Sequence, residues 1–336
     1  MKMLLLFLFM FTIYLPSYAE EDASLTLKKQ ESMDSKIQEG WTPKLKVGSQ
    51  FSLNSSNQVV GQKDGDSVTL GLNVKGGLTY KKDRSEWRQN LDYEGTTTKT
   101  PVLPRYVKSA DKIDYKSLYL RGLEKYPWLG PYARLTASTA LFKGEDVQSE
   151  AKEYINTSQS NLSLGTHNSY LLTDAFAPVT LSESVGFFAK LKETKTTLLE
   201  LRLGVGAVQY QADGQLRVAD DDTTTTKIEL AELKNSSQVG IEYGLVFQGK
   251  WDDNSDYSLT ADFLTPVSQD DIKAGEPCYE CSSIELTSVD LKASFGTKLS
   301  SWAKLAYEYK AFKQPTVFDK FQIQHGVVLN FDYSIY

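Results

Sequence analysis

The chain has 336 residues, with 43 acidic and 37 basic side chains, a formal net charge of −6 and 40% hydrophobic residues. This acidic balance argues against nucleic acid as a partner. Beyond residue 19, no apolar run approaches the roughly 20 residues that a membrane-spanning helix needs, which excludes a helical membrane protein.

The first 19 residues are typical of a cleaved secretory signal peptide. Lys2 is followed by an apolar stretch over 3–15, then Pro16, and then a small-x-small cleavage site at 17–19. An N-terminal membrane anchor is the alternative, but the apolar stretch is too short to span a bilayer. No cysteine lies at the cleavage site, which argues against a lipid-anchored mature protein. Residues 20–40 are charged and lack alternation, and we interpret them as a periplasmic segment.

From residue 41 to residue 336 the apolar residues recur with the period of two that is typical of strands, and we predict about twelve strands. The tenth strand loses its phase around Thr287 and Ser288, which predicts a β-bulge there. The predicted strands cover 42–54, 67–80, 86–98, 110–124, 132–142, 181–192, 197–211, 236–250, 256–265, 284–297, 301–312 and 321–335.

The gaps between these strands alternate between short and long, and all five tryptophans fall on the short-turn side: Trp41, Trp87, Trp128, Trp251 and Trp302. Bacterial outer-membrane barrels have short periplasmic turns, long external loops and aromatic girdles. The pattern therefore predicts an all-β fold, a transmembrane antiparallel up-and-down β-barrel with both termini in the periplasm. A soluble β-sandwich is the rival, but its strands are normally shorter and give no reason for tryptophans to lie on one side.

Two long gaps are predicted to be external loops that fold over or into the mouth of the barrel. They cover 144–179 and 212–234, and loops of this length are usually functional or disordered. The second contains an acidic run at 220–222, which we interpret as a solvated loop. Loose Ca²⁺ binding is the alternative, although no EF-hand spacing is present.

Charged residues of both signs share the predicted inward face of the strands. A single-sign ring would indicate selective conduction, whereas this mixture favours weak selectivity or a closed interior filled with ion pairs. The candidate lumen-lining residues are Lys75, Arg88, Asp92, Lys112, Asp114, Lys116, Glu200, Arg202, Glu242, Asp262, Asp290 and Lys292.

Cys278 and Cys281 are the two cysteines, and in an exported protein they most simply form a disulfide. A metal-binding or redox-active pair is the sharper alternative, but no further Cys or His ligands lie nearby. The sequence also lacks a phosphate-binding loop and a dinucleotide fingerprint. The glycines of Gly204–Gly206 lie mid-strand, where they indicate bending or close packing in the lumen. We predict no cofactor and no metal.

Histidine supplies the only hint of catalysis. His167 and Ser169 lie two residues apart, as in outer-membrane phospholipases, but they fall in a predicted polar loop and no orienting third group is evident. His325 is predicted to be a rim residue at the external end of the last strand. We therefore predict no catalytic residues and no enzyme, with an esterase as the remote alternative.

Several stretches resemble an uncharacterised family of Gram-negative outer-membrane β-barrels, a domain of unknown function. The resemblance is carried by the residues at 77–82, by Trp87 with 90–92, by 108–114 before a Tyr-rich strand, and by the closing 321–336. It implies a barrel in the outer membrane and no reaction. The expected partners are outer-membrane lipid and, during assembly, the barrel-insertion machinery, and the expected state is a monomer.

These observations together favour a narrow passive channel for small polar solutes or ions. The alternative is a plugged structural or surface-interaction barrel without conductance.

Overall fold

The computed structural model of the protein describes residues 39–56, 65–219, 226–270, 278, 281–300, 303–315 and 318–334. The predicted signal peptide, nearly all of the predicted periplasmic segment, the acidic run at 220–222 and Trp302 lie outside the described residues. Among the described residues there is no helix long and apolar enough to cross a membrane.

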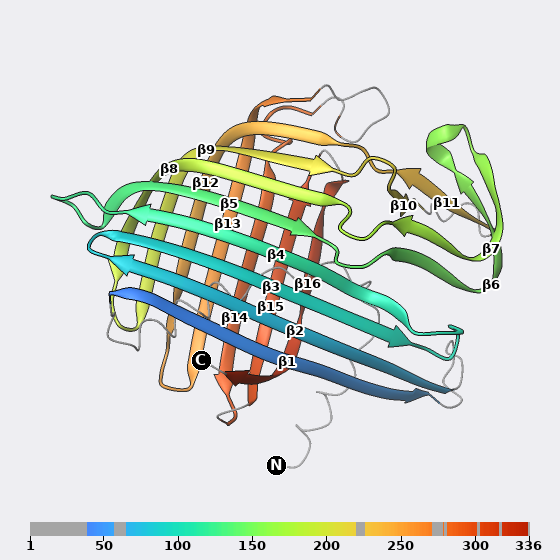
Figure 1. The fold of residues 1–336 in the computed structure, drawn as a ribbon, viewed down its shortest axis with the longest axis horizontal. Coiled ribbons are helices and arrows are strands. Elements are labelled where there is room, and N and C mark those ends of the chain that lie inside the picture. Colours follow the sequence, from blue (N-terminus) through green and yellow to red (C-terminus); the bar gives the residue numbers. More distant parts are fainter. Residues whose placement is uncertain are drawn as a thin grey trace, which may run out of the picture.

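Twelve strands form one closed antiparallel barrel, which confirms the predicted fold class (Figure 1). Neighbours in the chain are neighbours in the barrel, and the last strand returns to the first. The barrel strands are β1 (Gly40–Ser56), β2 (Gly65–Lys82), β3 (Ser85–Lys99), β4 (Val107–Arg121), β5 (Leu129–Thr139), β8 (Val179–Glu193), β9 (Thr197–Gln211), β12 (Ser236–Lys250), β13 (Ser255–Gln269), β14 (Ser288–Lys298), β15 (Ala303–Gln314) and β16 (Phe318–Ser334).

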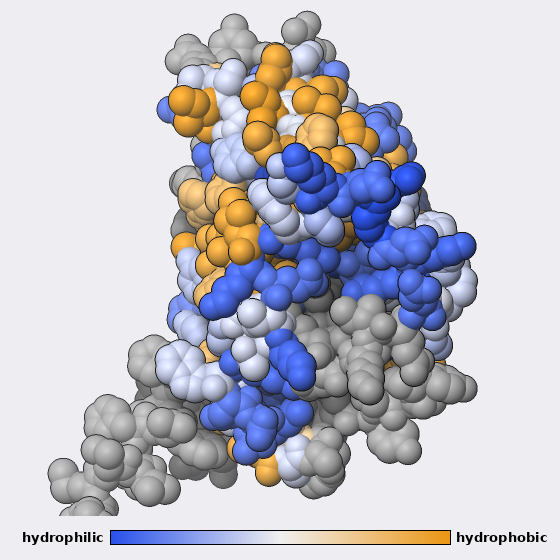
Figure 2. Space-filling model, turned by 90° about the vertical axis from the view of Figure 1, so that its left-hand side faces the viewer, coloured by the Kyte–Doolittle hydropathy of each residue, from blue (hydrophilic) through white to orange (hydrophobic). Residues whose placement is uncertain are grey.

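Strand β9 illustrates why these sequences form a wall between an apolar and a polar medium. Leu203 and Val205 point outward and are 61% and 58% exposed, whereas Glu200 points inward and is 1% exposed. Because successive side chains of a strand alternate between faces, each strand presents an apolar outer row and a polar inner row. On the face drawn in Figure 2, hydrophobic residues form patches on the upper and left flanks, and hydrophilic residues cover the middle.

An aromatic row crosses the short-turn ends of the first four strands. The cross-strand register places Trp41, Tyr80, Trp87 and Tyr119 side by side. The ring centroids of Trp41 and Tyr80 are 4.8 Å apart, and the indole Nε1 of Trp87 donates a hydrogen bond of 2.9 Å to Ser117. Trp128 and Trp251 are also exposed near short turns. The four described tryptophans therefore lie on the side that the sequence predicts.

The prediction of two long loops was wrong, because their residues form a four-stranded sheet with the order β10-β11-β6-β7. It consists of β6 (Gly144–Asn156), the 3₁₀ helix η1 (Thr157–Gln159), β7 (Leu162–Thr173), β10 (Leu216–Val218) and β11 (Lys227–Glu232). We call it the external sheet. It projects beyond one end of the barrel from the ends of β5, β8, β9 and β12 (Figure 1). A register shift between Val147 and Lys152 disrupts the period of two in β6, which hid this strand from the sequence pattern.

The predicted bulge near Thr287 was also wrong. Strand β14 begins at Ser288, and the residues before it form a turn in which the amide of Leu286 donates to the carbonyl of Ser282 at 3.0 Å. The loss of phase therefore marks the start of a strand. Shifts of register occur elsewhere in the barrel, for example between Val239 and Gly240.

Candidate functional site

The barrel interior is the candidate site, and the register places all twelve predicted lumen residues on its inner face. Lys75, Asp92 and Asp114 are consecutive partners across β2, β3 and β4. Arg202 is linked in the same way through β12 to Asp262 and Asp290. Because directly paired residues point to the same face of a sheet, these rows line one surface.

Five inward side chains form a connected group that we call the central network: Tyr132, Arg134, Arg202, Glu242 and Asp262. The Arg134 guanidinium lies 2.7 Å from the Glu242 carboxylate and 3.2 Å from the Asp262 carboxylate. Arg202 lies 2.9 Å from Asp262, and the Tyr132 hydroxyl donates to Glu242 at 3.1 Å. The network therefore joins β5, β9, β12 and β13.

Glycines on the inner face of β9 leave room for the side chains of this network. β5 and β12 are separated by β8 and β9, so Arg134 can reach Glu242 only across those two strands. A Cβ added at Gly206 would lie 3.1 Å from Glu242 Oε2, and one added at Gly204 would lie 2.9 Å from the Tyr132 hydroxyl. The close lumen packing that the sequence indicates for these two glycines therefore has a specific cause: the Tyr132 and Glu242 side chains lie over them.

A second group, the turn-end cluster, lies toward the short turns and consists of Lys81, Glu86, Arg88, Lys190 and Glu200. Glu86 lies 2.6 Å from Arg88, 3.3 Å from Lys190 and 3.7 Å from Lys81. Arg88 also lies 3.8 Å from Glu200, so one ion pair spans from β3 to β9.

Apolar side chains also point inward near this end of the barrel. Leu120, Tyr132 and Phe188 are each at most 3% exposed and form a small core, with Leu118 packed against it. The register pairs Leu120 with Glu86 on one side and with Tyr132 on the other. This sector of the interior is therefore filled by side chains. Tyr132 and the apolar group were not among the predicted lumen residues, although their spacing from Arg134 and Lys116 places them in the inward phase.

Water reaches the interior near β13 and β14. The side chains of Asp262 and Asp290 remain 30% and 29% exposed, whereas that of Glu242 is 5% exposed. Lys292 lies 3.3 Å from Asp290, and both it and Lys116 act electrostatically on Asp262 in addition to the two arginines. The accessible part of the lumen is thus lined by carboxylates and cations in close proximity.

The external sheet is fixed to the barrel rim by side chains that accept backbone hydrogen bonds. Asp111 accepts from the amides of Leu141 and Phe142 at 3.2 and 2.7 Å. Gln215 accepts from the amide of Asp174 at 2.7 Å, which links the two insertions. Such bonds hold the two connections in one conformation.

The core of the external sheet is formed where its two insertions meet. Tyr154 and Leu230 are fully buried, and β11 pairs in parallel with β6. Burial, followed by the 2.9 Å hydrogen bond to Asp146, raises the pKa of Tyr154.

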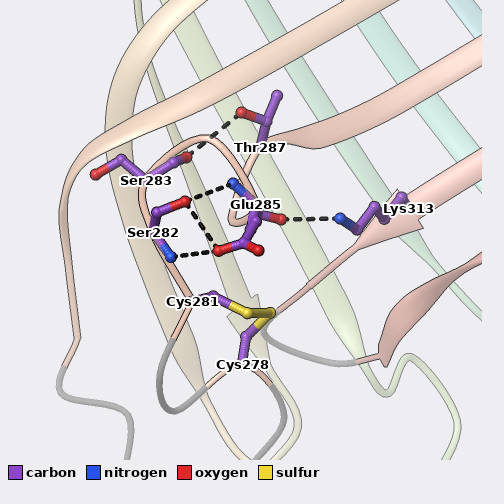
Figure 3. The surroundings of a disulfide bond; sticks show 7 residues. All are labelled: Cys278, Cys281, Ser282, Ser283, Glu285, Thr287 and Lys313. Atoms are coloured by element: carbon purple, nitrogen blue, oxygen red, sulfur yellow. Dashed lines mark hydrogen bonds between the residues drawn. A yellow bond between two sulfur atoms is a disulfide. The ribbon is translucent and has the colours of Figure 1, made fainter.

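The two cysteines form a disulfide with a Cα–Cα distance of 4.8 Å in the segment before β14 (Figure 3). Beside it, Glu285 accepts hydrogen bonds from the amide and hydroxyl of Ser282 at 2.8 and 2.9 Å, and these bonds lower the pKa of Glu285. The Lys313 ammonium donates to the backbone carbonyl of Glu285 at 2.9 Å. No group of three or more metal-ligating side chains occurs among the residues that the structure describes.

The histidines lie apart from the lumen. His167 is on β7, with Nε2 3.0 Å from the carbonyl oxygen of Leu164 and its ring beside Tyr170. His325 is not at the rim as predicted, because it pairs with Tyr309 in the middle of β16 and its ring centroid lies 6.4 Å from that tyrosine.

No protein-family model matches the chain, and no curated protein matches it. Among solved structures it is similar to the translocator domain of the autotransporter NalP from Neisseria meningitidis, with 10% identity and a TM-score of 0.41 over 92% of this chain and 93% of that one. An outer membrane channel from Pseudomonas putida F1 shows 9% identity and a TM-score of 0.40, with 94% and 99% covered. The β domain of the Bordetella autotransporter BrkA shows 12% identity and a TM-score of 0.33, with 88% and 99% covered.

Proposed function

We propose that the protein spans the outer membrane as a monomeric barrel and acts as a narrow, passive, weakly selective channel for small polar solutes or ions. The observation that carries this proposal is the exposure of Asp262 and Asp290 inside the barrel. Because both carboxylates face the interior and remain partly exposed, we infer that a polar path runs along β13 and β14. The proposal includes no catalytic step.

The outer surface supports the placement in a membrane. Exposed apolar residues such as Phe187 and Leu203 point outward on neighbouring strands, and the aromatic row lies at the short-turn ends. Aromatic rings favour the boundary between hydrocarbon and water. The polar rim around the external sheet would then face the exterior, and assembly would depend on the barrel-insertion machinery.

Weak selectivity follows from the pairing of charges. Lys292 lies 3.3 Å from Asp290, and Asp262 is contacted by two guanidiniums. Each accessible carboxylate is therefore neutralised at short range, and a passing ion meets no ring of a single sign.

Single-channel conductance of the mature chain, residues 20–336, in a planar bilayer tests this proposal. We expect discrete steps that increase with salt concentration. Asp290→Asn should shift the reversal potential toward anions, because it removes one accessible negative charge from the lumen wall beside Lys292. Asp253→Asn, in an exposed turn, is the matched control and should leave the reversal potential unchanged. Absence of conductance from demonstrably folded protein would refute the channel.

A second candidate is a sealed barrel that acts through its external sheet. The turn-end cluster and the apolar core of Leu120, Tyr132 and Phe188 favour it, because they fill the interior near the short turns. This candidate predicts folded but electrically silent protein. Surface binding would then be lost when the external sheet is deleted, whereas deletion of the sheet from a channel would alter conductance.

A further inference from the structure

The junction between the first and last strands is much less paired than the rest of the barrel. β1 pairs with β2 along all 17 of its residues, from Gly40 to Ser56. Within the described residues, β1 pairs with β16 at only three positions, Lys46–Gly48 opposite Asp332–Ser334. Figure 1 shows β16 meeting β1 near the C-terminal end of β16 and running away from it elsewhere. We call this junction the seam.

The seam differs from every other junction in the barrel. The next shortest is β4–β5, which has eight paired positions, from Ile113 to Leu120. Beyond Gly48, residues 49–56 of β1 and 318–331 of β16 have no partner across the seam among the described residues. Unpaired backbone amides and carbonyls are strongly disfavoured in hydrocarbon. Among the described residues, backbone hydrogen bonds therefore do not hold the external half of the seam closed, and its free backbone groups must contact water or a polar head group.

On the β2 side of the seam, the inner wall is uncharged, whereas Glu308 and Lys310 of β15 face inward on the other side. In the external half of β2, the inward positions are Ser67, Thr69, Gly71 and Asn73. Thr69 shares a hydrogen bond of 3.0 Å with Thr98 on β3. The central network lies on other strands, from β5 to β13. A molecule at the seam would therefore meet hydroxyl and amide groups where it contacts β2.

The outer wall beside the seam is apolar except at His325. Phe321, Ile323 and Val327 on β16 are 53%, 56% and 68% exposed and face outward, and the exposed His325 lies between Ile323 and Val327 in the same row. The inner face of β2 is polar and the outer face of β16 is apolar apart from His325. The two faces therefore match the head group and the alkyl chain of an amphiphile. One narrow chain between the strands would bring its polar end to the hydroxyl-lined wall.

We propose that the external half of the seam is a lateral opening through which the alkyl chain of a single-chain amphiphile passes between the lumen and the membrane, with its polar head group against the wall at Thr69. This proposal requires the barrel to lie in a bilayer. It does not depend on whether the lumen conducts ions.

Quenching by nitroxide-labelled phospholipid acyl chains tests the opening. A fluorophore on Thr69→Cys reports the inner wall beside the seam. Thr136→Cys, also inward and in the external half of its strand, is the matched control on β5, and Val185→Cys is the lipid-facing positive control. The native cysteines form a disulfide and do not react with the label.

We expect about threefold stronger quenching at Thr69 than at Thr136, approaching that at Val185, because lipid chains reach the lumen only at an unpaired junction. Free fatty acid should displace the quencher at Thr69 and leave Val185 unaffected. Equal, weak quenching at Thr69 and Thr136 would overturn the proposal. A silent barrel that still shows quenching at Thr69 would refute the channel and leave the opening intact.

Cross-linking across the seam gives a second measurement that does not rely on a fluorophore. Val47→Cys with Tyr333→Cys joins positions that the structure pairs and should oxidise completely. Leu53→Cys with Val327→Cys joins positions that would be opposite if the same register continued, and should not cross-link. Equal cross-linking of both pairs, in variants that keep folded migration on unheated gels, would show a closed seam and overturn the proposal.

Discussion

The central network makes a quantitative prediction about the dielectric environment of the barrel interior. Removing one partner of a buried ion pair costs about 3–5 kcal/mol. Arg134 keeps Asp262 at 3.2 Å when Glu242 is removed, so we expect the lower limit, about 3 kcal/mol, for Glu242→Ala. The loss of the acceptor for the Tyr132 hydroxyl adds about 1 kcal/mol. We expect about 3 kcal/mol for Arg134→Ala as well, because Glu242 is then left buried.

The double variant is the informative one. When both partners are removed, no uncompensated charge remains at this position, so we expect about 4 kcal/mol rather than the sum of the single effects, a coupling energy of about 2–3 kcal/mol. Urea unfolding in phospholipid vesicles measures these values. The exposed pair Lys143 and Asp174, 3.4 Å apart, is the control and should couple by less than about 0.5 kcal/mol. Additive effects at Arg134 and Glu242 would show that the network lies in bulk-like water and would refute the filled wall.

Three further predictions address the lumen, the external sheet and the disulfide segment. Lys112→Glu with Lys116→Glu should shift the reversal potential of a conducting barrel toward cations; an unchanged value would contradict the inward assignment of β4. Deleting residues 145–172 should make Arg217 and Lys227 rapidly cleavable by trypsin, because β11 loses its partner β6 and Leu230 its cover, while the barrel keeps its folded migration. The pKa of Glu285 is lowered, so its contacts stabilise the loop above the ordinary value of 4.5 and are lost as pH falls through the lower folded value. Reduction of Cys278–Cys281 by a phosphine, normalised to a model disulfide, should therefore accelerate at acidic pH in the native protein and be fast at every pH in Glu285→Ala.

The barrel could be predicted because its physics is local. Each strand carries its own alternation, and each turn its own length, so β9 or β12 can be recognised without knowing its neighbours. The same locality explains the failures. The alternation of apolar residues in β6 is interrupted by a register shift. β11 pairs with β6, which belongs to the other insertion. The external sheet can therefore form only after the pairing of β8 with β9 has brought the two insertions to the same rim of the barrel. The mid-strand position of His325 likewise depends on a strand that starts earlier than its alternation indicates.

The sequence could place charges inside the barrel, but it could not show which of them would be buried, because burial depends on contacts between strands that are distant in the chain. Where the wall presents glycine, as at Gly204 and Gly206, long side chains from β5 and β12 fold flat onto the backbone and bury one another. The carboxylate of Asp290 is not covered in this way and remains 29% exposed, although the Lys292 ammonium lies 3.3 Å from it. Inward glycine alone does not exclude water, because Asp262 lies over the inward Gly244 and is still 30% exposed. What buries Glu242 is the combination of Gly206 beneath it and the Arg134 and Tyr132 side chains that contact it, so Gly206→Ser should disturb Glu242 and leave Asp290 unchanged.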